Sequence, residues 1–177
     1  MQAKRLFLIG PMGAGKTSVG KRLAQALGLR FVDSDHVIEA RTGAAIPLIF
    51  DVEGEAGFRR REQAIIDELT QVDGIVLATG GGAVLAPENR EHLRGRGTVV
   101  YLQTSIEQQL ERTRHDKNRP LLQTENPRAR LEELMRIRAP LYRETAHITV
   151  ATDAGNPRQV VRDIVRQLEA GAASTHN

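Results

Sequence analysis

The 177-residue chain has no cysteine and very few aromatic residues, with no Trp, two Tyr and four Phe. The lack of cysteine excludes disulfide bonds, thiolate zinc sites and cysteine nucleophiles, which fits a reducing compartment. So few rings exclude a surface that stacks nucleic-acid bases. The net charge is only +3 and the arginines are spread along the chain. We therefore expect small anionic ligands and no nucleic-acid partner.

Long hydrophobic runs are also absent. The apolar run 6–9 follows a basic start and is too short for a signal peptide or a membrane span. We expect a cytoplasmic monomer with no membrane partner. The length suits a single domain, which we place at residues 1–170, followed by a disordered tail at 171–177.

A glycine-rich loop with a lysine and a hydroxyl occupies residues 10–17, with the sequence GPMGAGKT. It lies between an apolar run and a helical pattern, which is the setting that a phosphate-binding P-loop requires. Its backbone N–H groups can surround phosphate oxygens, Lys16 can reach the outer phosphates, and the Thr17 hydroxyl can ligate Mg²⁺. The helix that follows directs its positive end at the same anion.

Short apolar runs alternate with helical patterns along the chain. The runs predict five strands at Arg5–Ile9, Phe31–Asp33, Ile75–Ala78, Thr98–Leu102 and Ile148–Val150. Helix starts are indicated by Ser105 with Gln108, by Asn126-Pro127 and by Asn156-Pro157. This alternation predicts an α/β fold with a parallel sheet covered on both faces and ligands at the carboxyl ends of the strands.

Two carboxylates, Asp33 and Asp35, follow the second predicted strand, which we expect to neighbour the P-loop strand. If the backbone is still extended there, both face one side, so that one can approach Mg²⁺ and the other an acceptor hydroxyl. Alternatively, one or both cap the helix that begins near His36.

Three consecutive glycines, Gly80, Gly81 and Gly82, follow the third predicted strand. Each costs about 0.5–1 kcal/mol more to order than alanine, which favours close approach by a ligand over a flexible turn. Many P-loop enzymes place a metal-linked aspartate just before this point, but this chain has Thr79. Asp33 is then the available metal-side carboxylate.

Arginines mark two further regions of interest. Arg59, beside Phe58, suits a small carboxylated ring. The alternative for Arg59 is a solvated i,i+3 ion pair with Glu62. For Arg60 and Arg61 we prefer the interpretation as solvated ion pairs. Arg138 lies near the end of a helix that starts near Pro127, and it fits a ligand contact or an ordinary C-terminal cation equally well.

The polar stretch 112–124 indicates a mobile lid, with a solvated loop as the alternative. Arginines in such a lid reach a transferring phosphoryl group only after closure.

Taken together, these motifs resemble those of the shikimate kinase family from Gly10 to about Pro157. The resemblance implies a P-loop kinase fold with a five-stranded parallel sheet, helices on both faces and a mobile lid. It also implies ATP and shikimate as substrates, Mg²⁺ as cofactor, and transfer of the γ-phosphoryl group to the shikimate 3-hydroxyl.

The same resemblance implies a role for each matching residue. The catalytic set is Lys16, Asp35 and Arg119, and the metal ligands are Thr17 and Asp33. Nucleotide contacts fall to Gly13, Ala14, Gly15, Lys16, Thr17, Ser18, Arg112, Arg119, Asn156 and Pro157. Shikimate contacts fall to Asp35, Arg59, Gly80, Gly81, Gly82 and Arg138. The lid residues His115 and Lys117 carry no implied role.

Three other functions stay open at this point. Gluconate kinase also joins a P-loop to paired carboxylates, and a nucleoside monophosphate kinase is a second possible enzyme. A nucleotide-sensing module without chemistry is the third, although Lys16, Thr17, Asp33 and Asp35 are all present.

Overall fold

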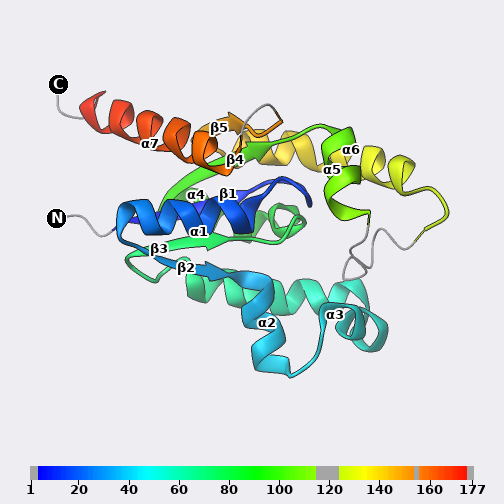
Figure 1. Ribbon diagram of the computed structural model, residues 1–177. Coiled ribbons are helices and arrows are strands. Elements are labelled where there is room, and N and C mark those ends of the chain that lie inside the picture. The colour runs from blue at the N-terminus through cyan, green and yellow to red at the C-terminus, as the bar shows by residue number, and fades with distance from the viewer. Residues whose placement is uncertain (1–3, 115–123, 154–155, 175–177) are drawn as a thin grey trace.

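The computed structural model describes residues 4–114, 124–153 and 156–174. Its centre is one five-stranded sheet whose pairings are all parallel, in the order β2-β3-β1-β4-β5 (Figure 1). The strands are β1 (Arg5–Ile9), β2 (Arg30–Asp33), β3 (Ile75–Ala78), β4 (Thr98–Gln103) and β5 (Ile148–Ala151). The predicted parallel sheet is confirmed, but β3 lies between β1 and β2, so the expectation that Asp33 follows a neighbour of the P-loop strand is wrong.

Helices cover both faces of this sheet, as predicted (Figure 1). They are α1 (Lys16–Leu27), α2 (Ser34–Thr42), α3 (Ile46–Leu69), the 3-10 turn η1 (Ala83–Leu85), α4 (Pro87–Arg96), α5 (Ile106–Thr113), α6 (Pro127–Thr145) and α7 (Pro157–Ser174). Alternate side chains of β1 enter the two cores: Phe7 and Ile9 pack with residues of α3, α4 and α6, whereas Leu6 and Leu8 pack with α1 and α7.

Helix starts agree with the predicted caps. Ser105, Asn126 and Asn156 each accept a hydrogen bond from the backbone N–H three residues later. The tail prediction is wrong for residues 171–174, because α7 continues to Ser174. In the described part of the chain, no helix is long and apolar enough to cross a membrane.

Two helices near the site contain a residue that disfavours a regular helix. In α3, Gly54 has φ 73° and ψ 175°, so the chain kinks there between two helical segments. The prediction that the helix starting near Pro127 ends close to Arg138 is wrong, since α6 contains Pro140 and runs on to Thr145. The burial of Tyr142 and Thr145 stabilises the turns beyond the proline, and tertiary packing thus outweighs the local cost of Pro140.

One histidine joins the start of β5 to β4. His147 Nδ1 accepts a hydrogen bond from Val99 N at 2.9 Å, which requires the neutral imidazole. Burial, and then the charge of Arg94, lower the pKa of His147 below its ordinary value of 6.5. A lowered folded-state pKa contributes stability that is present above pH 6.5 and is lost as the pH falls through the folded-state value.

We expect His147→Asn, which can keep an acceptor there but does not titrate, to lose less stability than the wild type between pH 7.5 and pH 5. The difference should be at most about 0.5–1.5 kcal/mol, the contribution of one hydrogen bond. Urea unfolding at the two pH values measures this difference in the free energy of unfolding. His92→Asn is the control, because the His92 imidazole lies 3.6 Å from a carboxylate, that of Asp67, and does not accept the backbone hydrogen bond that His147 accepts. Equal acid sensitivity of the wild type and His147→Asn would contradict the expectation.

Candidate active site

A pocket of about 490 Å³ opens beyond the carboxyl ends of β1, β2 and β3. Nearly all of the predicted site residues within the described part of the chain line it, although they come from six different segments. These segments are the P-loop, the start of α2, α3, the glycine triplet, α5 and α6. The carboxyl edge of the sheet therefore gathers the motifs at one place, as the parallel arrangement predicts.

The P-loop is held open by glycine conformation. Gly10, Gly13 and Gly15 have φ values of 148°, 79° and 90°, which other residues rarely adopt. Gly15 caps α1, so the positive end of that helix faces the pocket. Lys16 Nζ donates to the carbonyls of Gly10 at 2.5 Å and Pro11 at 2.9 Å. The loop thus presents backbone N–H groups and one ammonium in the geometry that binds phosphates.

Asp33 serves two partners with its two oxygens. Oδ1 accepts from the backbone N–H groups of Asp35 and His36 and caps α2, whereas Oδ2 lies 3.3 Å from Thr17 Oγ1. The capping alternative is therefore correct for Asp33, and it leaves Oδ2 beside the Thr17 hydroxyl. Because α2 begins at Ser34, the idea that Asp33 and Asp35 share one face of an extended backbone is wrong.

The pair Thr17 and Asp33 fits Mg²⁺. Both side chains offer hard oxygen atoms at the mouth of a phosphate loop, and Mg²⁺ is usually bound by one or two protein oxygens together with substrate phosphates and waters. The described residues contain no group of three or more His, Cys, Asp or Glu side chains that could hold a metal by itself. A metal at this point would depend on the nucleotide.

The glycine triplet permits close approach by side chains. None of its three residues has a positive φ. A Cβ atom on Gly80 would lie 2.9 Å from both Asp35 Oδ1 and Glu62 Oε2, and one on Gly82 would lie 2.5 Å from Arg59 Nη1. Larger residues would displace the acidic and basic groups of the pocket.

Arg59 lies over this backbone in a network of charges. Its Nη1 donates to Glu62 Oε1 at 2.9 Å, its Nη2 lies 3.3 Å from Glu55 Oε1, and its guanidinium stands 5.2 Å from the centre of the Phe58 ring. The i,i+3 pair with Glu62 therefore forms, but the prediction that it is solvated is wrong, because the Glu62 side chain is 1% exposed. Arg59 also lines the pocket, and its contact with a carboxylated ligand stays a prediction. Arg61, by contrast, makes an exposed pair with Glu53, as expected of a solvated residue.

Arg138 projects from the middle of α6 and is 4% exposed. A Cβ atom on Gly81 would lie 3.5 Å from its Nη1. Burial lowers the pKa of Arg138, the Arg59 charge lowers it further, and Tyr142 and Glu62 oppose the shift. Arginine nevertheless keeps its charge in proteins. Two guanidinium groups from separate helices therefore converge on the triplet.

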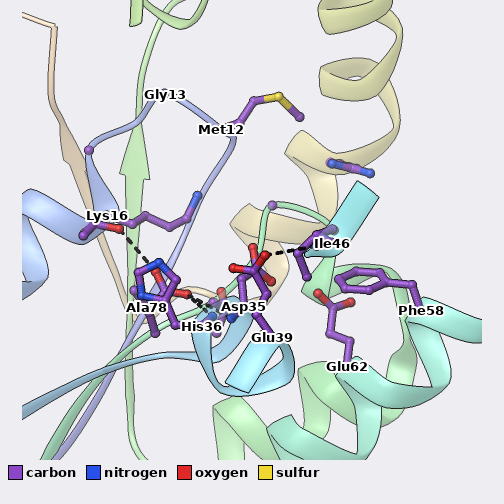
Figure 2. A pocket seen from close by; sticks show the side chains of 18 of the residues that line it. Met12, Gly13, Lys16, Asp35, His36, Glu39, Ile46, Phe58, Glu62 and Ala78 are labelled. Atoms are coloured by element: carbon purple, nitrogen blue, oxygen red, sulfur yellow. Dashed lines mark hydrogen bonds between the residues drawn. The ribbon is translucent and has the colours of Figure 1, made fainter. Parts of the chain in front are cut away.

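Glu62 is the site residue whose importance the sequence analysis missed. Figure 2 shows its carboxylate facing Asp35, with Phe58 beside it. Glu62 is 1% exposed, and burial raises the pKa of its carboxyl while the Arg59 charge opposes the rise. The signal was its helical phase, because Glu62 lies on the same stripe as Phe58, Ile65 and Leu69.

Arg112 reaches the P-loop from α5. Its Nη1 donates to the Gly13 carbonyl at 2.7 Å, and a Cβ atom on Gly13 would lie 3.0 Å from the Cα atom of Gln109. Gly13 thus allows α5 to pack directly on the loop.

Three predicted nucleotide residues do not line the pocket. Ala14 is buried beneath the loop, and Asn156 and Pro157 form the start of α7. Arg119, His115 and Lys117, with the lid residues 115–123, lie outside the described residues.

Comparison with known proteins agrees with this geometry. The sequence profile of the family described as shikimate kinase matches residues 12–169. The shikimate kinase of Halorhodospira halophila is 62% identical over 165 residues, which cover 93% of each chain. That of Methylococcus capsulatus is also 62% identical, over 166 residues that cover 94% of this chain and 93% of the relative.

Solved structures support the same assignment. The shikimate kinase from Acinetobacter baumannii in complex with shikimate superposes with a TM-score of 0.94 at 54% identity, covering 96% of this chain and 95% of that one. A gluconokinase from Sinorhizobium meliloti reaches a TM-score of 0.59 at 20% identity, which shows a shared fold alone. The chain therefore belongs to the shikimate kinase family.

Proposed function

We propose that this pocket transfers the γ-phosphoryl group of ATP to the 3-hydroxyl of shikimate, a step of aromatic amino-acid biosynthesis, with the residue roles given below. The observation that carries the proposal is the convergence of Arg59 and Arg138 on the glycine triplet, beside Asp35 and next to the P-loop. Two cations suit the carboxylate of the acceptor, and the loop suits the triphosphate.

The donor side is built on the P-loop. Backbone N–H groups of residues 13–18 and the α1 N-terminus bind the phosphates, and Lys16 stabilises the charge that develops on the transferring group. Arg112, already held at Gly13, lies at the nucleotide end of the pocket. Arg119 of the lid, together with Asn156 and Pro157, completes the proposed nucleotide contacts.

Thr17 and Asp33 would hold Mg²⁺ through Oγ1 and Oδ2. An ion held there would supply positive charge that offsets the charge of the nucleotide phosphates. The cap that Oδ1 makes to α2 keeps the other oxygen of Asp33 directed at Thr17.

The acceptor side orients a hydroxylated acid. Arg59 and Arg138 bind its carboxylate with planar, charge-assisted hydrogen bonds, while Asp35 accepts from the 3-hydroxyl near Gly80. Transfer is in line, directly to the hydroxyl. In a loose transition state the hydroxyl proton leaves late, so Asp35 acts first as an orienter and then as the proton acceptor.

The experiment that tests the proposal is a coupled assay of the purified protein with ATP, Mg²⁺ and shikimate. Gluconate and AMP serve as competing acceptors. We expect turnover with shikimate and less than about one hundredth of that rate with either competitor. Faster turnover with gluconate or AMP, or ATP binding without any transfer, would overturn the proposal. A cytoplasmic location and a monomeric state stay predictions.

The carboxylate contact makes a separate prediction. Shikimate methyl ester should be a poor substrate, because losing the contact leaves partly buried guanidinium groups without their ligand, at about 1.5–3 kcal/mol or ten- to a hundredfold in kcat/KM. Arg59→Ala and Arg138→Ala should each shrink the preference for the acid over the ester, as measured by kcat/KM for the two compounds.

Arg61→Ala is the matched control, since it removes an exposed arginine from the same helix as Arg59. Its acid-over-ester preference should equal that of the wild type. If Arg59→Ala and Arg138→Ala both keep the full wild-type preference for the acid over the ester, neither residue binds the carboxylate.

A further inference from the structure

Tyr142 lies directly beneath the glycine triplet. It is 0% exposed, and its hydroxyl donates to the Gly81 carbonyl at 2.5 Å. The ring stacks on Tyr101 of β4, with centroids 5.0 Å apart and an interplanar angle of 29°. A side chain from the rigid core thus holds one particular carbonyl of the substrate-facing turn.

Gly81 is the point where the two halves of the pocket touch. A Cβ atom on Gly81 would lie 3.5 Å from Arg138 Nη1, 3.5 Å from Met12 N and 3.8 Å from the Gly10 carbonyl. Arg138 belongs to the acceptor side, whereas Met12 and Gly10 belong to the P-loop, and Gly10 also accepts from Lys16. A small displacement of Gly81 would therefore change the spacing between the acceptor cation and the phosphate loop.

Within the described part of the chain, the other backbone hydrogen bonds of this turn act at the ends of the triplet or beside it. Thr79 N donates to the Leu8 carbonyl at 3.1 Å, and Ala83 N donates to the Gly80 carbonyl at 3.0 Å. The contact from Tyr142 acts at the middle residue, where a glycine backbone has the most conformational freedom.

Tyr142 is suited to hold this carbonyl at any ordinary pH. Burial raises the pKa of its phenol, so the hydroxyl stays protonated and remains a donor. Its position four residues after Arg138 places both side chains on the same side of α6. The helix α6 therefore supplies both Arg138, for the acceptor, and the Tyr142 hydroxyl, which donates the hydrogen bond that holds the glycine turn.

We propose that Tyr142 is a positioning residue that holds Gly81 at the junction of the two subsites and thereby sets the acceptor in line with the phosphoryl donor. The inference rests on the proposed function. Tyr142 touches no reacting atom, and its effect passes through Gly81 and Arg138.

The test is Tyr142→Phe, with Tyr101→Phe as the matched control in the stacked partner ring. We expect Tyr142→Phe to lower kcat/KM for shikimate by about tenfold or more, since loss of a buried hydrogen bond and a small misplacement of the acceptor both act there. The KM for ATP should change by less than about twofold, because the P-loop keeps its own hydrogen bonds. Tyr101→Phe should leave both parameters near those of the wild type.

A general loss of stability would not lower kcat/KM for shikimate while leaving the KM for ATP nearly unchanged. If Tyr142→Phe retains wild-type kcat/KM for shikimate, or if the ATP and shikimate parameters fall together as in a partly unfolded protein, the positioning role is wrong. These outcomes differ from failure of the proposed function, in which the wild type itself would not phosphorylate shikimate.

A second measurement needs no variant at position 142. The chain has two tyrosines, so 3-fluorotyrosine labelling should give two ¹⁹F resonances, assigned with the Tyr101→Phe protein. On titration with shikimate, the Tyr142 resonance should shift more than the Tyr101 resonance. A Tyr142 resonance that does not respond at saturating shikimate would overturn the proposal.

Discussion

Replacing Asp35 with asparagine is expected to lower kcat by about 10²–10⁴-fold, the range for loss of a general base. The KM for shikimate should rise as well, because the same carboxylate orients the acceptor hydroxyl next to Gly80. The variant should stay folded. The Asp35 charge lies beside the buried Glu62 and raises the pKa of the Glu62 carboxyl, so that removing this charge relieves a repulsion between two carboxylates. Steady-state kinetics with shikimate varied at saturating ATP measure both effects.

Asp33→Asn is the matched comparison two residues away. Asparagine is as good an N-cap as aspartate, so α2 should keep its cap while the charge at Thr17 is lost. Its defect should therefore appear as a raised requirement for Mg²⁺, with nearly unchanged affinity for shikimate. If the two variants show the same magnesium titrations and shikimate affinities, the division of roles between the carboxylates is wrong.

Lys16→Ala should reduce turnover by about a hundredfold or more. One preorganised cation at the transferring phosphate contributes a few kcal/mol to transition-state stabilisation. The fold should persist, because Lys16 is the half-buried first residue of α1 at the edge of the pocket, and it donates hydrogen bonds to the carbonyls of Gly10 and Pro11 within the P-loop. Single-turnover kinetics at saturating ATP and shikimate separate this effect from weaker binding.

Lys21→Ala serves as the control, since it removes an exposed lysine from the same helix. It should retain wild-type turnover. A folded Lys16→Ala protein that keeps most of its activity would contradict the phosphate-binding role of the loop at residues 10–17.

The expected defects differ because the residues act on different atoms. Lys16 faces the phosphate side, and Asp35 the acceptor hydroxyl. Glu62 connects the acceptor groups, because it pairs with Arg59 and also faces Asp35 at Gly80. Variants of Asp35 and Arg59 should therefore show effects that are not additive when they are combined.

Features that depend on local chemistry could be predicted from the amino-acid sequence. The P-loop could be read from its glycines, Lys16 and Thr17, because backbone conformation and phosphate binding require those residue types at that spacing. Strands alternating with helices predicted the parallel sheet and placed the motifs at its carboxyl edge. The caps at Ser105, Asn126 and Asn156 follow from hydrogen bonds within one turn.

Features that depend on contacts between distant segments could not be predicted in this way. The insertion of β3 between β1 and β2, the continuation of α6 past Pro140 and the burial of Glu62 all depend on how distant segments pack. The hydrogen bond from Tyr142 to Gly81 joins residues 61 positions apart. Local propensity says little about such contacts, because burial and packing across the chain supply the free energy that selects them.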